Sequence, residues 1–246
     1  MIASHFLRSM SLNVDPAALP EVYPFTIPAI RKMPTLDFHP KVTFLVGDNG
    51  MGKSTLLEAL AIRCGLNAEG GGRNFNFATR KTHSPLHEFL DLVRGASRPT
   101  DDFFLRAESF YNVASNIEEI GISYVGYGGK SLHAQSHGES FWNLIENRFV
   151  GHGLYLLDEP EAALSPTRQM GALSLIHQLV HQHSQFIIAT HSPILMAYPD
   201  AWIYLLNEDG ISRVDYEDTE HYTITRDFLN HTQTSLKALL SEDDQQ

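Results

Sequence analysis

Residues 42–55 read VTFLVGDNGMGKST, a short apolar run followed by a glycine-rich loop. The run 42–46 contains β-branched and aromatic residues and predicts a buried strand. The loop matches the pattern G-x-x-x-x-G-K-[ST], with Gly47, Gly52, Lys53 and Ser54 in the fixed positions. Because a strand is expected before the loop, the pattern indicates a phosphate-binding loop and not a chance glycine turn.

A helix is expected to begin at this loop, because residues 54–64 carry leucines and an alanine at helical spacing. Glycines let backbone N–H groups turn towards phosphate oxygens, and a helix N-terminus attracts the same anion. Lys53 is expected to bind the β- and γ-phosphates, and the Ser54 hydroxyl to complete the coordination of Mg²⁺. The predicted nucleotide-binding residues of the stretch are Gly47, Asp48, Asn49, Gly50, Met51, Gly52, Lys53, Ser54 and Thr55.

A second apolar run, residues 154–157, ends in the carboxylates Asp158 and Glu159. Sites of parallel α/β folds lie at the carboxyl ends of the strands. An acidic turn after a strand is common by itself, but a phosphate loop upstream in the same chain favours a functional role. Asp158 is therefore predicted to hold Mg²⁺ through water, and Glu159 to polarise the water that attacks the γ-phosphate.

Composition narrows the function classes. A net charge of -11 argues against a general polyanion binder, although a local basic face stays possible. The single cysteine, Cys64, excludes an internal disulfide framework and a cysteine-based zinc module. The longest apolar runs fall far short of the roughly 20 residues of a membrane helix. We expect a cytoplasmic protein without direct membrane insertion.

Strand-like runs alternate with helix-like segments, which favours an α/β fold with a largely parallel central sheet. Prolines make residues 20–34 extended or turning, and residues 6–14 alternate like an edge strand. Further strands are expected at 74–77, 103–105 and 185–189, with a hairpin at 202–214. Helices are expected up to about 120, at 140–149 and at 167–181, with a glycine-rich break at 126–129.

The phosphate loop and the acidic strand end together resemble those of the ABC class of P-loop ATPases. Residues 136–140, SHGES, resemble the ABC signature, whose serine and glycine touch the γ-phosphate held by the opposite subunit. His137 and Glu139 depart from the common Leu-Ser-Gly-Gly-Gln form, so Ser136 and Gly138 are the positions carried over. Residues 161–166 resemble the D-loop. Residues 189–193 resemble the switch-histidine loop, which implies that His191 contacts the γ-phosphate.

Within that class, the chain looks most like the SMC and RecF branch and the small stand-alone bacterial "predicted ATPases" of the AAA type. The stretches 23–25, 73–77, 104–109 and 217–222 carry the latter resemblance. It implies one ABC-type ATPase domain over 1–246, with a mostly parallel sheet, N-terminal antiparallel strands, and ATP and Mg²⁺ as ligands. A small helical subdomain at 109–150 would contain the signature.

Several positions leave alternatives open. ABC proteins usually carry a glutamine where this chain has residues 106–108, so Glu108 either reaches the metal or the attacking water, or caps a surface helix. Tyr23 and Phe25 are candidates for stacking on adenine, against packing in a core or turn. Arg73 either contacts nucleotide or caps a turn.

Three pairs of histidines at i, i+4 spacing could in principle hold zinc on a helix. No acidic or cysteine partner completes a recognisable ligand set, and a chain with 13 histidines contains such pairs by chance. We therefore expect no metal at these pairs, which are His83 with His87, His133 with His137, and His177 with His181.

The sequence thus predicts an ATP-binding and ATP-hydrolysing switch that forms a homodimer on binding ATP. In that interpretation Lys53, Glu159 and His191 carry the reaction. One alternative is the nucleotide-binding subunit of a membrane transporter. Another is the ATPase module of a DNA-repair or phage-defence complex with an unidentified protein partner. Nucleic acid is possible as a partner but is not indicated by the charge, and a P-loop kinase would leave 136–140 and His191 unexplained.

Overall fold

The protein is seen in a computed structural model that describes residues 5–72, 83–119, 131 and 135–241. Its centre is a six-stranded sheet in the order β5-β6-β7-β3-β8-β9. Neighbouring strands are parallel except for the hairpin of β8 and β9. The strands are β3 (Val42–Val46), β5 (Asp101–Arg106), β6 (Gly153–Asp158), β7 (Gln185–Ala189), β8 (Trp202–Asn207) and β9 (Gly210–Val214). The predicted α/β fold with a mostly parallel sheet is confirmed.

A second, antiparallel sheet has the order β2-β1-β4, built from β1 (Leu7–Leu12), β2 (Leu36–Asp37) and β4 (Leu90–Arg94). It confirms the expected N-terminal antiparallel strands. The prediction of an edge strand at 6–14 is wrong, because β1 pairs on both sides and lies in the middle of this sheet. Alternation reveals that one face of a strand is buried, but not which of its edges are paired.

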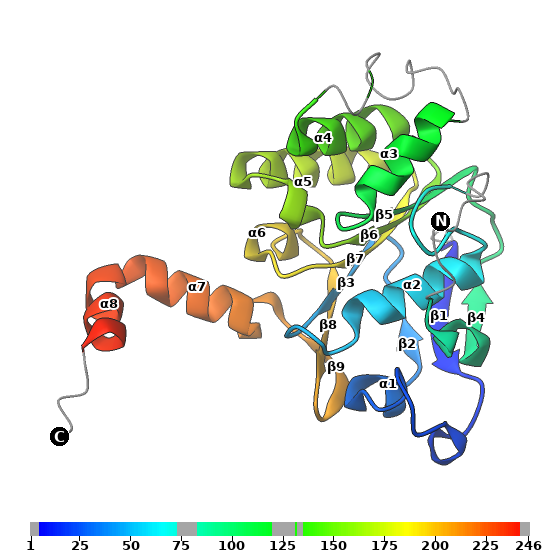
Figure 1. Cartoon of the computed structure of the whole chain (residues 1–246), viewed down its shortest axis with the longest axis horizontal. Coiled ribbons are helices and arrows are strands. Elements are labelled where there is room, and N and C mark those ends of the chain that lie inside the picture. The colour runs from blue at the N-terminus through cyan, green and yellow to red at the C-terminus, as the bar shows by residue number, and fades with distance from the viewer. Residues whose placement is uncertain (1–4, 73–82, 120–130, 132–134, 242–246) are drawn as a thin grey trace.

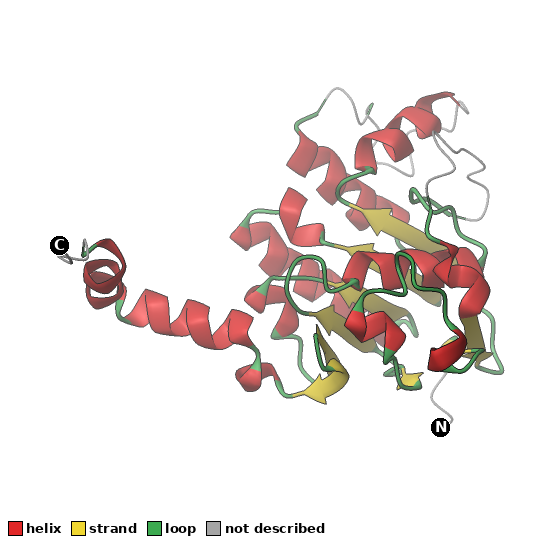
Figure 2. Ribbon diagram, turned by 60° about the horizontal axis from the view of Figure 1, so that its bottom comes forward, coloured by secondary structure: helices red, strands yellow, loops and turns green. Residues whose placement is uncertain are grey.

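Helices cover both faces of the central sheet (Figures 1 and 2). The longer helices are α2 (Lys53–Cys64), α3 (Phe110–Glu119), α4 (His137–Arg148), α5 (Pro166–His181), α7 (Glu220–Asn230) and α8 (Thr232–Leu240). Short helical segments are α1 (Pro28–Arg31), α6 (Pro193–Met196) and the 3-10 turns at Pro16–Ala18, Pro85–Phe89, Pro160–Ala163 and Tyr216–Asp218. None of the described helices is long and apolar enough to cross a membrane.

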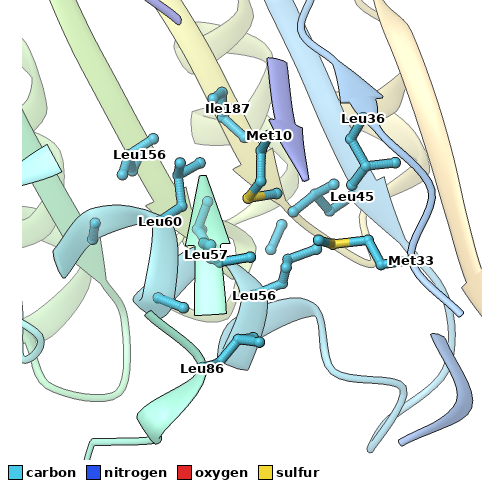
Figure 3. Close-up of a cluster of buried hydrophobic side chains, with 14 of the residues drawn as sticks. Met10, Met33, Leu36, Leu45, Leu56, Leu57, Leu60, Leu86, Leu156 and Ile187 are labelled. Carbon is cyan, nitrogen blue, oxygen red and sulfur yellow. The ribbon is translucent and has the colours of Figure 1, made fainter. Parts of the chain in front are cut away.

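Two hydrophobic cores lie on opposite faces of the central sheet, because successive strand residues point to opposite sides. Phe44 belongs to the core shared with α3, α4, α5 and α6, whereas Leu45 belongs to the core beneath α2 and the antiparallel sheet. Figure 3 shows Leu56, Leu57 and Leu60 of α2 pointing into this second core. The helix that follows the phosphate loop is thus clamped between two sheets.

The boundaries of the elements differ from the predictions in informative places. α4 begins at His137, three residues before the expected start, because Ser136 and Glu139 form a capping box. The expected strand at 74–77 and the glycine-rich break at 126–129 lie outside the described residues. α7 and α8 were not predicted, and they form an arm that projects away from the sheet (Figures 1 and 2).

Candidate nucleotide-binding site

The phosphate loop connects the carboxyl end of β3, inside the central sheet, to α2. Gly47 has φ +140° and Gly52 has φ +93°, backbone conformations that favour glycine. A Cβ atom at Gly47 would lie 2.2 Å from the carbonyl oxygen of Leu206, so β8 leaves no room for a side chain. The predicted order of strand, loop and helix is confirmed, and the two glycines are needed for its shape.

Lys53 is buried within its own loop. Its ammonium donates hydrogen bonds to the carbonyl oxygens of Gly47, at 2.8 Å, and Asp48, at 3.0 Å. Burial lowers the pKa of Lys53, while the Glu159 and Asp158 carboxylates act in the opposite direction. The Lys53 ammonium therefore lies at the N-terminus of α2, which would also attract the expected phosphates.

The register of the sheet brings Asp158 to this loop. Asp158 at the end of β6 is the register partner of Arg106 on β5 and of Ala189 on β7. The Ser54 hydroxyl donates a hydrogen bond of 2.9 Å to Asp158 Oδ1, and Arg106 Nε lies 3.2 Å from Asp158 Oδ2. Burial raises the pKa of Asp158 to about 6, against the opposing effect of the Arg106 guanidinium.

These groups fit the predicted magnesium site. A hydroxyl oxygen and a carboxylate oxygen in hydrogen-bond contact are the hard ligands that Mg²⁺ prefers, usually with waters and phosphate oxygens completing its shell. Among the described residues no group of three or more histidine, cysteine or acidic side chains could hold a metal by itself.

Glu159 and His191 face each other beside Asp158. Glu159 has φ +49°, a left-handed conformation, and its N–H donates to the carbonyl oxygen of Ala189. This turn points its carboxylate towards His191, with Oε1 3.7 Å from Nε2. Both side chains are partly exposed, and no described residue makes a hydrogen bond to His191 Nε2. A carboxylate and an imidazole beside the phosphate loop are suited to proton transfer and to phosphate contact.

The segment that resembles a D-loop is tied to the histidine loop by Glu161. Its partly buried carboxylate accepts hydrogen bonds from the Thr190 hydroxyl, at 2.7 Å, and from the backbone N–H of His191. Burial raises the pKa of Glu161, and these two hydrogen bonds oppose that rise. A movement of the D-loop segment would therefore also displace the switch-histidine loop, and the reverse.

His221, near the start of α7, is a site residue that the sequence interpretation missed. Its Nε2 lies 3.0 Å from Nδ1 of His191. His221 also lines a cavity of about 230 Å³ beside Gly47 and Asp48 of the phosphate loop. One histidine among 13, thirty residues from its partner, carries no spacing signal, and only the resemblance at 217–222 pointed to this stretch.

Ser136 and Gly138 lie at the N-terminus of α4, which Figure 1 shows well apart from α2 and the phosphate loop. The Ser136 hydroxyl and N–H both donate to Glu139 Oε2, at 2.7 and 3.1 Å. A Cβ at Gly138 would lie 2.9 Å from the carbonyl oxygen of Ala163, so this glycine is packed against the D-loop segment. His137 stacks on Tyr111 of α3, which gives that departure from the signature a packing role.

The remaining candidates separate by exposure. The Glu108 side chain is 89% exposed, and its nearest cation is Arg106 at 3.7 Å, so its predicted role at the nucleotide stays a prediction. The exposed Tyr23 hydrogen bonds through its hydroxyl to Thr55, at the edge of the phosphate loop. Phe25 is fully buried against Phe89 and packs in the core. Arg73 lies outside the described residues.

Two of the three histidine pairs have both members among the described residues. His83 and His87 lie with ring centroids 5.5 Å apart, and His177 and His181 with ring centroids 4.3 Å apart. His177 and His181 are each hydrogen bonded within the protein, to the Tyr198 hydroxyl and to the carbonyl oxygen of His177 respectively. His133, the partner proposed for His137, lies outside the described residues.

Comparisons with known proteins match different parts of the chain. A family model described as an AAA domain matches residues 29–112, which include the phosphate loop. UvrABC system protein A of Salmonella typhimurium (strain LT2) is 26% identical over 129 residues, which cover 51% of this chain and 13% of that protein. The same protein of Rhizobium meliloti (strain 1021) is 22% identical over 143 residues, 56% of this chain and 14% of that one. The matched stretch is thus a small part of these relatives.

A solved structure supports the fold along almost the whole chain. The protein cbiO1 from Clostridium perfringens, described as part of the ABC transporter complex cbiONQ, gives a TM-score of 0.52 at 16% identity. The superposition covers 96% of this chain and all of that one. The fold is thus similar to that of an ABC-type ATPase domain, and the phosphate loop and the acidic end of β6 lie at the positions that this fold provides for nucleotide.

Proposed function

We propose that this chain binds Mg·ATP, hydrolyses it, and pairs head to tail with a second copy around two ATP molecules. The observation that carries the proposal is the arrangement at the ends of β6 and β7. There the Ser54 hydroxyl contacts Asp158 at 2.9 Å, and the next residue, Glu159, lies 3.7 Å from His191. The residues proposed as metal ligands, base and phosphate contact are thus neighbours, which supports a role in γ-phosphate hydrolysis.

In the proposed reaction, Lys53 and the backbone N–H groups of residues 47–54 bind the phosphate oxygens. Glu159 accepts a proton from a water molecule, whose oxygen forms a bond to the γ-phosphorus as the bond to the β–γ bridging oxygen breaks. The products are ADP and inorganic phosphate. Mg²⁺ held near Ser54 and Asp158 would neutralise charge on the phosphates. His191 donates a hydrogen bond to the γ-phosphate.

The second copy supplies Ser136 and Gly138 from the N-terminus of α4, a helix that Figure 1 shows apart from α2 of the same chain. The helical subdomain proposed for residues 109–150 would carry these two residues. Glu161 links the D-loop segment to His191, so loss of the γ-phosphate would be sensed at both loops. Opening and closing of the dimer is then the output of the ATPase cycle.

The test is size-exclusion chromatography with light scattering on Glu159→Gln, with and without Mg·ATP. We expect a monomer that becomes a dimer only with ATP, because the amide binds the water but does not take its proton. Lys53→Ala in the same background is the matched control and should stay monomeric. Binding of nucleotide without any change in mass would contradict the homodimer.

A role inside a larger assembly has one observation in its favour, the sequence similarity to UvrABC system protein A over about half of the chain. We infer from it that an ATPase module in nucleic-acid processing is the second candidate, ahead of a transporter subunit. The net charge of -11 weighs against direct binding of nucleic acid. Stimulation of ATP hydrolysis by double-stranded DNA at low salt would favour this candidate, and its absence would leave the self-contained switch.

A further inference from the structure

The ring of His191 has one close neighbour at each nitrogen. Nδ1 lies 3.0 Å from Nε2 of His221, and Nε2 lies 3.7 Å from Glu159 Oε1. Burial lowers the pKa of both histidines, which makes each ring neutral near neutral pH. A neutral imidazole carries one N–H, so the bond between the two rings contains one hydrogen, donated by one ring to the other.

The surroundings select which ring donates. If His191 donated from Nδ1, its Nε2 lone pair would face the Glu159 carboxylate, and His221 would bury an N–H at Nδ1. If His221 donates from Nε2, the Nε2–H of His191 points at the carboxylate instead. Each arrangement leaves one buried N–H without a hydrogen bond from the described residues, at His221 Nδ1 in the first and at His191 Nε2 in the second, so only the carboxylate 3.7 Å from His191 Nε2 distinguishes them. Because a carboxylate attracts an N–H and repels a lone pair, the position of Glu159 favours this second arrangement.

We propose that His221 is a positioning residue: its Nε2–H donates to His191 Nδ1 and holds His191 in the tautomer that carries its hydrogen on Nε2. That hydrogen faces Glu159 and the site of the attacking water, so His191 is ready to donate to a γ-phosphate oxygen. This role rests on the function proposed above, whereas the tautomer itself is a property of the free protein. In the opposite tautomer His191 would present a lone pair to the phosphate, which repels it.

The location of His221 connects this tautomer to the arm. His221 is the second residue of α7, whose start is fixed by the buried Thr219: its side chain accepts a hydrogen bond from the N–H of Tyr222. The remainder of α7 and all of α8 project from the sheet (Figures 1 and 2). A displacement of the first turn of α7 would break the contact between the two imidazoles, so the seating of the arm and the readiness of His191 are coupled.

The first experiment measures the tautomer directly by ¹⁵N–¹H correlation spectra of the histidine rings in the nucleotide-free full chain at pH 8. The His191 signals are assigned with His191→Gln. We expect hydrogen on Nε2 in the wild-type protein, a mixture of tautomers in His221→Ala, and restoration in His221→Gln, whose amide N–H donates from a similar position. Hydrogen on Nδ1 in the wild type, or an unchanged tautomer in His221→Ala, would overturn the proposal.

The second experiment measures steady-state ATP hydrolysis. His221→Ala should lower kcat by about 10-fold or more with KM for ATP changed less than about twofold, because His221 orients the His191 ring without binding the substrate itself. His221→Gln should recover most of kcat. His231→Ala, the same change near the far end of α7, is the control and should match the wild type. An equal loss in both alanine variants would contradict a positioning role.

The two experiments separate this proposal from the proposed function. The expected tautomer in a protein without ATPase activity would leave the positioning of His191 intact and remove its assigned purpose. An active ATPase in which neither kcat nor the His191 tautomer changes on substitution of His221 would support the proposed function and overturn the positioning role of His221. Thermal unfolding of each variant shows whether His221→Ala is folded, and the comparison of His221→Gln with wild type stays informative if it is not.

Discussion

The phosphate loop and the N-terminus of α4 are the two phosphate-binding motifs of the proposed dimer, and they use their polar groups differently within one chain. In the loop, the Lys53 ammonium is held by backbone carbonyl oxygens, and the Ser54 hydroxyl contacts Asp158. At α4, the hydroxyl and N–H of Ser136 both engage the Glu139 carboxylate. The loop places an ammonium group where a phosphate would bind, whereas α4 places a carboxylate where a phosphate would approach.

This difference shows that the phosphate loop and the N-terminus of α4 are not equally prepared to bind phosphate. In the loop, phosphate competes for Lys53 only with neutral carbonyl oxygens. At α4 it must displace, or lie beside, a carboxylate at the positive end of a helix. We therefore expect nucleotide to bind first at the loop, with pairing of the chains as the more costly second step.

Removal of Lys53 has the largest expected effect. Lys53→Ala should weaken ATP binding by about 100-fold, because charge-assisted hydrogen bonds contribute about 1.5–3 kcal/mol. The measurement is titration with a fluorescent ATP analogue. Lys41→Ala removes an exposed lysine paired with Asp200 and should bind as the wild type does. Equal affinity in both variants would show that the loop does not bind the phosphates.

Substitution of Arg106 tests whether the stability of the region around the phosphate loop depends on a buried cation. Its guanidinium lies between Glu58 at 2.8 Å and Asp158 at 3.2 Å, and all three side chains are largely buried. Arg106→Met should lower the free energy of unfolding by about 2–3 kcal/mol, because two buried carboxylates lose their partner. Urea unfolding measures the change.

The matched control is Glu108→Ala. Its exposed side chain should contribute less than about 0.5 kcal/mol to stability. The same variant decides the open question at this position, because a fall in ATP hydrolysis without a change in stability would assign Glu108 the role of the usual glutamine. A loss of stability as large as that of Arg106→Met would contradict its exposed placement.

Local motifs explain what the sequence could predict. The phosphate loop and the acidic end of β6 follow contiguous apolar runs, and a glycine pattern at fixed spacing has few other structural uses. The partners of these motifs come from distant parts of the chain. Arg106 meets Asp158 only through the register of β5 and β6, and His221 meets His191 only because α7 starts beside the phosphate loop.

α4 shows how one pattern can have two meanings. The spacing of Ser136 and Glu139 is that of a helix capping box as well as part of a signature-like segment. Sequence reasoning took Glu139 only as a departure from the common form. The structure shows that the capping geometry uses the same serine that the dimer would need, which periodicity and composition do not reveal.

Glu139→Gln is the sharpest way to alter the comparison, since it removes the charge and keeps the capping box. We expect ATP-dependent pairing of the Glu159→Gln background to strengthen by about 10-fold, as the like charge facing the γ-phosphate is lost. Sedimentation at several protein concentrations gives the dimer dissociation constant. Glu146→Gln makes the same charge change on the exposed face of α4 and should have little effect. Weaker pairing in Glu139→Gln would mean that the carboxylate helps the interface.

The smallest expected effect concerns Glu161, whose carboxylate links the D-loop segment to the switch-histidine loop. Burial raises the pKa of its carboxyl above the unfolded value, so the folded protein binds this proton more tightly than the unfolded chain does. Stability therefore falls as pH rises from the unfolded value near 4.5 to the folded pKa, and the cost is fully present above that. Glu161→Gln removes this titration and can still accept the N–H of His191.

The stability of Glu161→Gln relative to the wild type should therefore increase between pH 4.5 and pH 7.5, as measured by urea unfolding at intermediate steps. Glu217→Gln, at an exposed position, is the control and should show no such trend. A difference that shrank with rising pH would mean that the hydrogen bonds from Thr190 and His191 stabilise the ionised carboxylate more than burial destabilises it. In that case the ionised Glu161 carboxylate would hold the D-loop segment to the switch-histidine loop, and this contact would be strongest at neutral pH.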